Sequence, residues 1–95
     1  MARRPDASSS GGPYRIELRP AALRALRRID PADRPRVRGA IELLAREPRP
    51  PSSRPLRGRD GWRLRVGDYR ILYTIHDDVL RIVVVTMGHR RDVYR

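Results

Sequence analysis

The chain has 95 residues and no cysteine, and it carries 22 Lys+Arg against 11 Asp+Glu, a formal net charge of +11. This length allows one small domain with a single core and excludes two, and the missing cysteines exclude disulfides, thiol catalysis and zinc–thiolate sites. The excess of positive charge, all of it arginine, predicts phosphate and therefore nucleic acid as the partner.

Residues 1–13 are rich in Ser, Gly, Pro and Arg and have no apolar periodicity. We therefore predict a disordered basic tail over residues 1–13 and one folded domain over residues 14–95. The tail lacks the apolar core of a signal peptide, and no apolar run reaches the roughly 18 residues of a membrane span. We expect a soluble, cytoplasmic protein that does not bind a membrane.

The first half of the domain predicts one strand and two helices. Residues 14–18 alternate apolar and charged side chains, the period of a half-buried strand. One helix is predicted from Pro20 to Ile29, and a second is predicted after Asp33, which we expect to cap it. The apolar stripes of the two helices are Ala22, Leu23, Leu26 and Ile29, and Val37, Ala40, Ile41 and Leu44. We expect an antiparallel helical hairpin on a sheet, followed by an extended proline-rich loop over residues 47–55.

The second half predicts three consecutive antiparallel strands. Residues 62–66 alternate strictly, and Gly67 with Asp68 fits a two-residue type II′ turn with glycine first. This turn fixes the register of the hairpin. The expected pairs on the helix-covered face are Val66 with Tyr69, Leu64 with Ile71, and Trp62 with Tyr73.

The same register gathers three arginines on the uncovered face of the sheet. Arg65 falls opposite Arg70, and Arg63 falls opposite Leu72. Like charges directly opposite one another cost a few tenths to about 1 kcal/mol. An anion held between the guanidinium groups would offset this cost, because their planar forks match phosphate oxygens. The alternative is that the long arginine side chains splay apart into water.

A second two-residue turn, at Asp77 and Asp78, is predicted to join the last two strands. The resulting pairs are Ile75 with Leu80, Tyr73 with Ile82, Leu72 with Val83, and Arg70 with Val85. The continuous apolar run over residues 82–85 is typical of a central strand buried on both faces. We therefore expect an apolar floor of Leu72, Val83 and Val85 beside the arginines, typical of an active-site cleft or a partner-binding surface.

These residues carry a resemblance to a known family. The order RLRVGDYRILYTI, a short acidic turn, and an apolar strand ending GHRRDVY resembles the RelE branch of the RelE/ParE superfamily, the toxins of type II toxin–antitoxin pairs. The resemblance spans residues 14–95. It implies an α+β, microbial ribonuclease-like fold, in which an N-terminal strand and an antiparallel helical hairpin precede a three-stranded antiparallel sheet.

The resemblance also implies an activity and a partner. RelE-type members cut mRNA in the ribosomal A site without a metal or other cofactor, and so inhibit translation. A cognate antitoxin protein wraps such a toxin and masks its site. The ParE branch, which inhibits DNA gyrase by binding, stays open as an alternative. So does a non-catalytic RNA-binding protein of the same fold.

Site residues follow from the resemblance one by one. Arg63 and Arg65 match two basic positions that are often lysine in the family, and Arg70 matches the arginine of its glycine-x-tyrosine-arginine element. Arg90 matches the arginine just after the last strand, and Tyr94 matches the terminal tyrosine. The chain departs from the best-known RelE in a tail shorter by two residues between Arg90 and Tyr94.

The expected reaction is attack of a ribose 2′-hydroxyl on the adjacent phosphorus. Phosphate binding is assigned to Arg63, Arg65, Arg70 and Arg91. Arg90 would lie near the leaving oxygen. Arginine stays protonated in proteins and cannot serve as the base. Tyr94 is favoured for that role because surrounding arginines would stabilise its phenolate. His89 is the rival, because imidazole is the side chain that exchanges protons near neutral pH.

Overall fold

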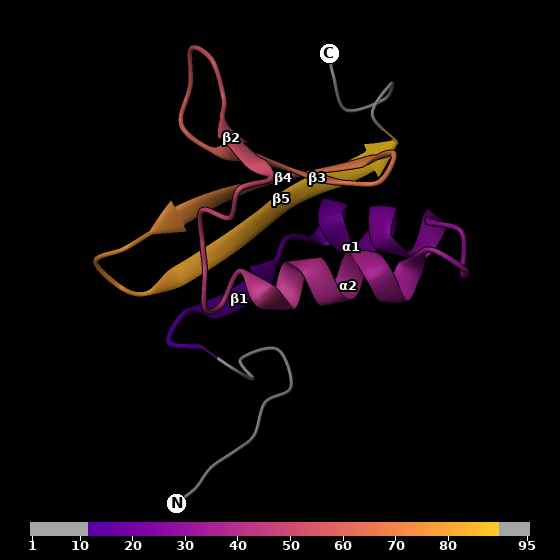
Figure 1. The fold of residues 1–95 in the computed structure, drawn as a ribbon, viewed down its shortest axis with the longest axis horizontal. Helices are drawn as coiled ribbons and strands as arrows, with labels where there is room; N and C mark the ends of the chain where they lie inside the picture. The colour runs from indigo at the N-terminus through magenta and orange to yellow at the C-terminus, as the bar shows by residue number, and fades with distance from the viewer. Residues whose placement is uncertain (1–11, 90–95) are drawn as a thin grey trace, which may run out of the picture.

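A computed structural model of the chain describes residues 12–89, so residues 90–95 and most of the predicted tail lie outside the described part. The elements in order are β1 (Arg15–Leu18), α1 (Pro20–Arg28), α2 (Arg34–Leu43), β2 (Ser53–Pro55), β3 (Trp62–Val66), β4 (Tyr69–His76) and β5 (Arg81–His89). The predicted α+β order, a strand and two helices followed by antiparallel strands, is confirmed (Figure 1).

The strands form one mixed five-stranded sheet in the order β1-β5-β4-β3-β2. β1 runs parallel to β5, and every other neighbouring pair is antiparallel. The two helices lie side by side against one face of this sheet, and the loop between β2 and β3 rises from the other (Figure 1). The sheet therefore has one covered face and one open face.

β2 is an edge strand that was not predicted. Residues 47–55 were expected to form only an extended loop, but Ser53 pairs with Leu64 and Pro55 with Trp62 on β3. Proline has no N–H to donate, and an edge strand tolerates this because one of its sides has no partner. A proline-rich segment can therefore end in a short strand at the margin of a sheet.

Polar contacts fix where the two helices meet. Arg34 donates from Nη2 to the carbonyl oxygens of Arg27, at 3.1 Å, and Ile29, at 2.9 Å, which satisfies the end of α1. Asp33 is the N-cap residue of α2, as predicted, but its side chain makes no capping hydrogen bond. Its Oδ2 accepts instead from the hydroxyl of Tyr69 on β4, at 3.1 Å. Neither described helix is long and apolar enough to cross a membrane.

The core lies between the helices and the covered face of the sheet. The predicted stripes contribute most of its helical side, although Leu23 is 42% exposed because it lies at the margin of its stripe, about 100° around the helix from Ala22. Fully buried side chains of Tyr73 and Ile71 on β4 pack beneath the helices. The largest buried side chains are Tyr73, Leu44, Ile71, Ile82, Val37 and Val84.

The register of the first hairpin is confirmed. Trp62 lies opposite Tyr73, Leu64 opposite Ile71, and Val66 opposite Tyr69. Gly67 has a φ of +58°, as the first central residue of a type II′ turn requires. A Cβ at this position would also collide with the guanidinium of Arg36 from α2. Glycine is therefore favoured there by its conformation, whereas the flexible Arg36 side chain could move aside for a Cβ.

The predicted register of the second hairpin is wrong. Residues 77–80 make a four-residue connection, and Leu80 adopts a left-handed φ of +52°. Two-residue hairpin turns need positive φ, and Asp77 and Asp78 both stay at negative φ, so the connection lengthens. A β-bulge beside Leu72 shifts the register further. The observed pairs are Ile75 with Ile82, Tyr73 with Val84, Leu72 with Thr86, and Arg70 with Gly88.

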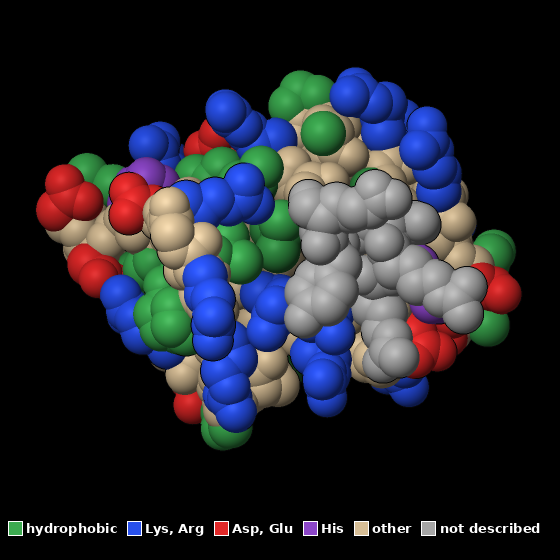
Figure 2. All heavy atoms as spheres, turned by 90° about the horizontal axis from the view of Figure 1, so that it is seen from above, with side chains coloured by type: hydrophobic (Ala, Val, Ile, Leu, Met, Phe, Trp, Pro, Cys, Tyr) green, Lys and Arg blue, Asp and Glu red, His purple; other side chains and the backbone are tan. Residues whose placement is uncertain are grey.

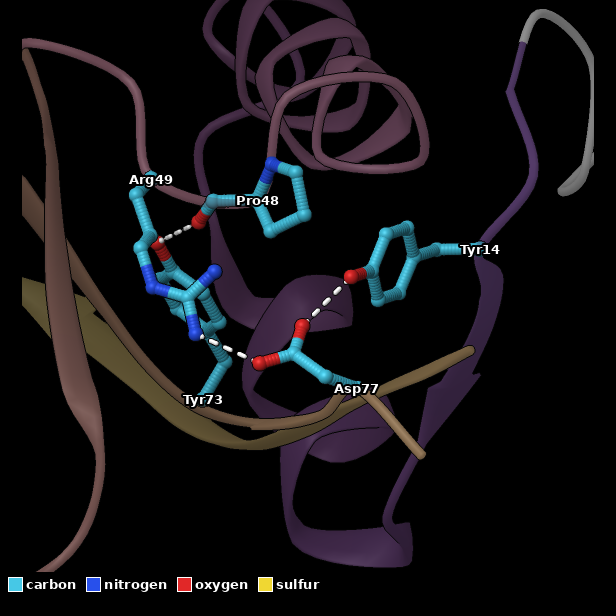
Figure 3. Close-up of polar contacts among 5 residues, drawn as sticks. All are labelled: Tyr14, Pro48, Arg49, Tyr73 and Asp77. Atoms are coloured by element: carbon cyan, nitrogen blue, oxygen red, sulfur yellow. Dashed lines mark hydrogen bonds and ion pairs between the residues drawn. The ribbon is translucent and has the colours of Figure 1, made fainter. Parts of the chain in front are cut away.

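A polar network ties three segments together at the end of the sheet nearest β1 (Figure 3). Asp77 accepts from the hydroxyl of Tyr14 and from Nη2 of Arg49, the latter at 2.8 Å. Tyr73 donates its hydroxyl to the carbonyl of Pro48, at 2.6 Å. The hydrogen bonds from Arg49 and Tyr14 lower the pKa of the Asp77 carboxyl. The network holds the start of the loop that leads into β2.

Candidate nucleic-acid interface

The open face of the sheet carries a basic hollow. Figure 2 looks onto this face and shows arginine side chains across its middle, beside an apolar area. The hollow has a volume of about 270 Å³. Its described lining residues are Pro51, Ser52, Arg54, Arg63, Arg65 and Arg70. We call this site the arginine hollow.

The three predicted arginines meet in the arginine hollow. Arg65 lies directly opposite Arg70, and Arg63 lies opposite Leu72, as the hairpin register requires. Their environments differ: Arg65 is exposed and Arg63 is half-buried, whereas Arg70 is only 6% exposed. A guanidinium that is buried cannot splay into water, so the position of Arg70 is set by the fold.

A fourth arginine in the hollow, Arg54, was missed by the sequence analysis. It lies on β2 directly opposite Arg63. Its Nη1 donates to the carbonyl oxygens of Pro51, at 3.2 Å, and Ser53, at 3.0 Å. Its only sequence signal is the order of a small polar residue, Ser53, and a charged one, Arg54, in a strand of three residues. It is too short to be separated from loop sequence without knowledge of the pairing with β3.

The predicted apolar floor is wrong in two of its three members. Leu72 is buried, at 8% exposed, on the same face as Arg63. Val83 pairs with Thr74, farther along β4 from the arginines, and Val85 is 38% exposed where the bulge leaves it without a partner on β4. The register shift therefore sets Thr86 and Gly88 beside Leu72 and Arg70. This part of the floor is more polar and less bulky than predicted.

His89 lies away from the arginine hollow. It is the last residue of β5, opposite Tyr69, and the two rings meet edge to face with centroids 6.0 Å apart and an interplanar angle of 75°. Tyr69 reaches Asp33 at the start of α2, so both rings lie on the covered face. Burial, and then the hydrogen bond to Asp33, raise the pKa of the Tyr69 hydroxyl. The structure does not bring His89 and the arginines together.

Three of the predicted site residues, Arg90, Arg91 and Tyr94, lie outside the described residues. They follow the end of β5, where Gly88 pairs with Arg70. Within residues 12–89, no cluster of three or more His, Cys, Asp and Glu side chains is arranged to hold a metal ion. The charged side chains that line the described part of the site are guanidinium groups.

Known proteins resemble this chain along most of its length. A family model described as the ParE toxin of the type II toxin–antitoxin system parDE matches residues 16–94. The chain is 34% identical over 91 residues to Toxin RelG of Mycobacterium tuberculosis. The match covers 87% of this chain and 98% of the relative.

Solved structures agree with the sequence relatives. The RelE–RelB complex of Pyrococcus horikoshii matches with a TM-score of 0.74 and 26% identity, over 82% of this chain and 96% of that one. The RelBE2 toxin–antitoxin complex of Mycobacterium tuberculosis matches with a TM-score of 0.64 and 30% identity, over 82% and 99% of the two chains.

The family model and the curated relative each span the strand, the helical hairpin and the arginine-bearing strands. The fold, with its covered and open faces, is that of the RelE structures. The chain belongs to the RelE/ParE superfamily and is a toxin of a type II toxin–antitoxin system.

Proposed function

We propose that this toxin is a ribosome-dependent endoribonuclease of the cytoplasm that cleaves mRNA in the ribosomal A site and thereby inhibits translation. The arginine hollow is the observation that supports this function. Four of its six described lining residues are arginine, and they lie on the face that the helices leave open. Guanidinium groups in this arrangement fit a phosphodiester backbone better than any neutral ligand.

The proposed chemistry is an internal phosphoryl transfer. The ribose 2′-oxygen loses its proton and bonds to the neighbouring phosphorus, while the bond from phosphorus to the 5′-oxygen of the next nucleotide breaks. The departing 5′-oxygen takes up a proton from water, so the products are a 2′,3′-cyclic phosphate and a 5′-hydroxyl end. Negative charge builds up on the phosphorane oxygens, and groups held ready to receive this charge lower the barrier most.

Arg70 is the residue best placed to receive that charge. Its burial holds the guanidinium in position before the substrate arrives, so no reorganisation is needed during the reaction. Two further arginines would bind the same phosphate. Arg65 lies directly opposite Arg70 on β3, and Arg63 lies two residues from Arg65 on the same face. Arg91, just after β5, would add a further positive charge to the bound RNA.

Proton transfer is assigned to the segment that follows β5. Tyr94 is proposed to take the 2′-hydroxyl proton, and Arg90 is proposed to stabilise the leaving 5′-oxygen. His89 is the weaker candidate, because its ring lies against Tyr69 on the covered face. Arginine remains protonated, so none of the arginines in the hollow can act as the base.

A cognate antitoxin is the proposed protein partner. The Pyrococcus horikoshii and Mycobacterium tuberculosis relatives were both crystallised as toxin–antitoxin complexes. A chain with a formal net charge of +11 is suited to an acidic partner. We propose that the antitoxin covers the arginine hollow, so that the complex does not cleave RNA.

Inhibition of DNA gyrase is the second candidate. The observation in its favour is that the matching family model is described as a ParE toxin. Gyrase inhibition by binding needs no group that moves a proton, so the arginine hollow would then be a protein-docking surface.

Toeprinting of mRNA on translating ribosomes, run beside a gyrase supercoiling assay, separates the two functions. The proposed function predicts cuts at codon spacing within the A site and unaffected supercoiling. Lost supercoiling without cuts would instead establish the ParE-type activity. Purified antitoxin, added before the toxin, should abolish the cuts.

A further inference from the structure

The arginine hollow contains two opposed arginine pairs rather than one. Arg65 faces Arg70 across β3 and β4, and Arg54 faces Arg63 across β2 and β3. Each pair sets like charges opposite one another, and an anion bound between the guanidinium groups would offset the repulsion. A single phosphate accounts for only one of the two pairs.

The spacing of the pairs follows from strand geometry. Arg63 and Arg65 are two residues apart on β3 and point to the same face, so their Cα atoms are separated by about 6.6 Å. Successive phosphates of an extended RNA strand are separated by a comparable length. The two pairs are therefore placed to hold two neighbouring phosphates.

Arg54 is fixed for such a role by its own loop. Both of its hydrogen bonds, to the carbonyls of Pro51 and Ser53, start from Nη1. They leave the edge formed by Nε and Nη2, which is one of the guanidinium forks that bind phosphate side-on. The polar network around Asp77 holds the start of the same loop through Arg49, and Tyr73 holds it through Pro48.

The two pairs differ in their distance from the proposed proton-transfer groups. The Arg65–Arg70 pair lies beside Gly88, near the end of β5, and the proposed proton-transfer residues follow β5 in the sequence. The scissile phosphate belongs there. The Arg54–Arg63 pair lies on the far side, toward the edge strand β2.

We propose that Arg54 and Arg63 bind a phosphate next to the scissile one, which makes Arg54 a substrate-binding residue contributed by the edge strand. This inference rests on the proposed ribonuclease function. The Arg54–Arg63 pair would fix which linkage of the mRNA lies at the Arg65–Arg70 pair, because a strand held at two successive phosphates cannot slide.

The test uses ribosome complexes programmed with synthetic mRNAs, in which one linkage beside the scissile phosphate carries a neutral methylphosphonate. Single-turnover cleavage by the wild-type toxin should slow about fivefold for one of the two flanking linkages, the loss typical of an exposed charge-assisted contact. Arg54→Gln should slow cleavage of unmodified mRNA by a similar factor. Cleavage of the neutral-linkage mRNA by Arg54→Gln should be no slower than cleavage with either change alone.

Arg24→Gln, an exposed arginine on α1, removes the same charge far from the hollow and is the matched control. Its response to the neutral linkage should equal that of the wild type. The inference would be overturned if Arg54→Gln and the neutral linkage together slowed cleavage by the product of their separate factors. It would also be overturned if cleavage by the wild type were insensitive to both flanking linkages. Either result would leave the proposed function standing. A wild type that does not cut unmodified mRNA would overturn both.

Discussion

Arg70 is the arginine to which we propose a role different from that of the other arginines in the chain. All 22 basic residues other than histidine are arginine, so residue type alone does not distinguish a working arginine from a solvated one. Burial does: Arg70 is 6% exposed, whereas Arg65 opposite it is exposed. A positioned guanidinium receives charge in a transition state without first losing conformational freedom.

Removal of the Tyr94 hydroxyl tests the assignment of the base. Tyr94→Phe should slow single-turnover cleavage of A-site mRNA about 100-fold or more, the usual loss when a general base is removed. His89→Ala should change the rate by less than about threefold, because its ring packs on Tyr69 rather than in the arginine hollow. Wild-type rates in both variants would remove both assignments.

Asp77 links the stability of the fold to pH. Hydrogen bonds from Arg49 and Tyr14 lower its pKa below the value near 3.9 expected in the unfolded chain. The resulting stabilisation is fully present above about pH 4 and is lost as the pH falls through the lower, folded pKa. Asp77→Asn should therefore reduce Tm at pH 7 by a few degrees at most, and this difference should shrink below about pH 4.

The control for this change is Asp78→Asn. Asp78 is the neighbouring exposed residue and makes no ion pair or hydrogen bond within residues 12–89. Circular dichroism melts of the three proteins between pH 7 and 2.5 give the comparison. Equal Tm values for the Asp77 variant and the wild type at pH 7 would show that the network does not stabilise the fold.

At the scale of elements, turn chemistry decided which parts of the sheet were predictable. Glycine at position 67 supplies the positive φ of a two-residue turn, and this fixed every pair between β3 and β4. The segment from Asp77 to Leu80 contains no glycine, and sequence alone did not show that Leu80 would take the left-handed conformation. The β4–β5 register and the position of the bulge were consequently wrong.

The edge strand β2 was unpredictable for a different reason. Three residues that include a proline carry too little periodicity to indicate a strand, and their pairing depends on β3, which comes later in the chain. Arg54 was missed with it. Arg63, Arg65 and Arg70 were correctly placed on one face because their own hairpin, a local structure, sets the register between β3 and β4.

The strained residue of the second hairpin gives a stability prediction. A left-handed φ costs a non-glycine residue roughly 1–2 kcal/mol, and asparagine tolerates it better than leucine. Leu80→Asn should therefore raise the free energy of unfolding by about 0.5 to 1 kcal/mol, measured by urea denaturation. The neighbouring Val79 is 59% exposed and does not have positive φ, so Val79→Asn should bring no gain. A less stable Leu80→Asn would contradict the assigned turn.

At the scale of the whole molecule, the sheet divides the chain into a folding face and a working face. The helices pack on the first with nearly all the buried apolar side chains, and the second carries the four arginines of the arginine hollow (Figures 1 and 2). A charge excess of this size steers a polyanion toward the protein at long range. We propose that the arginine hollow is where the RNA backbone then binds.

If phosphate is bound and cleaved on the working face, as we claim, the arginines of that face control the rate of cleavage. Single-turnover cleavage of an A-site mRNA is compared for the wild type, Arg70→Gln, Arg65→Gln and the charge-matched Arg24→Gln. Circular dichroism shows whether Arg70→Gln, a change at a buried position, still folds. The exposed Arg65 gives an independent variant if it does not.

We predict that the wild type and Arg24→Gln cut at the same rate, that Arg70→Gln cuts about 100-fold more slowly or worse, and that Arg65→Gln cuts about tenfold more slowly. Equal cleavage by all four folded proteins would contradict the claim.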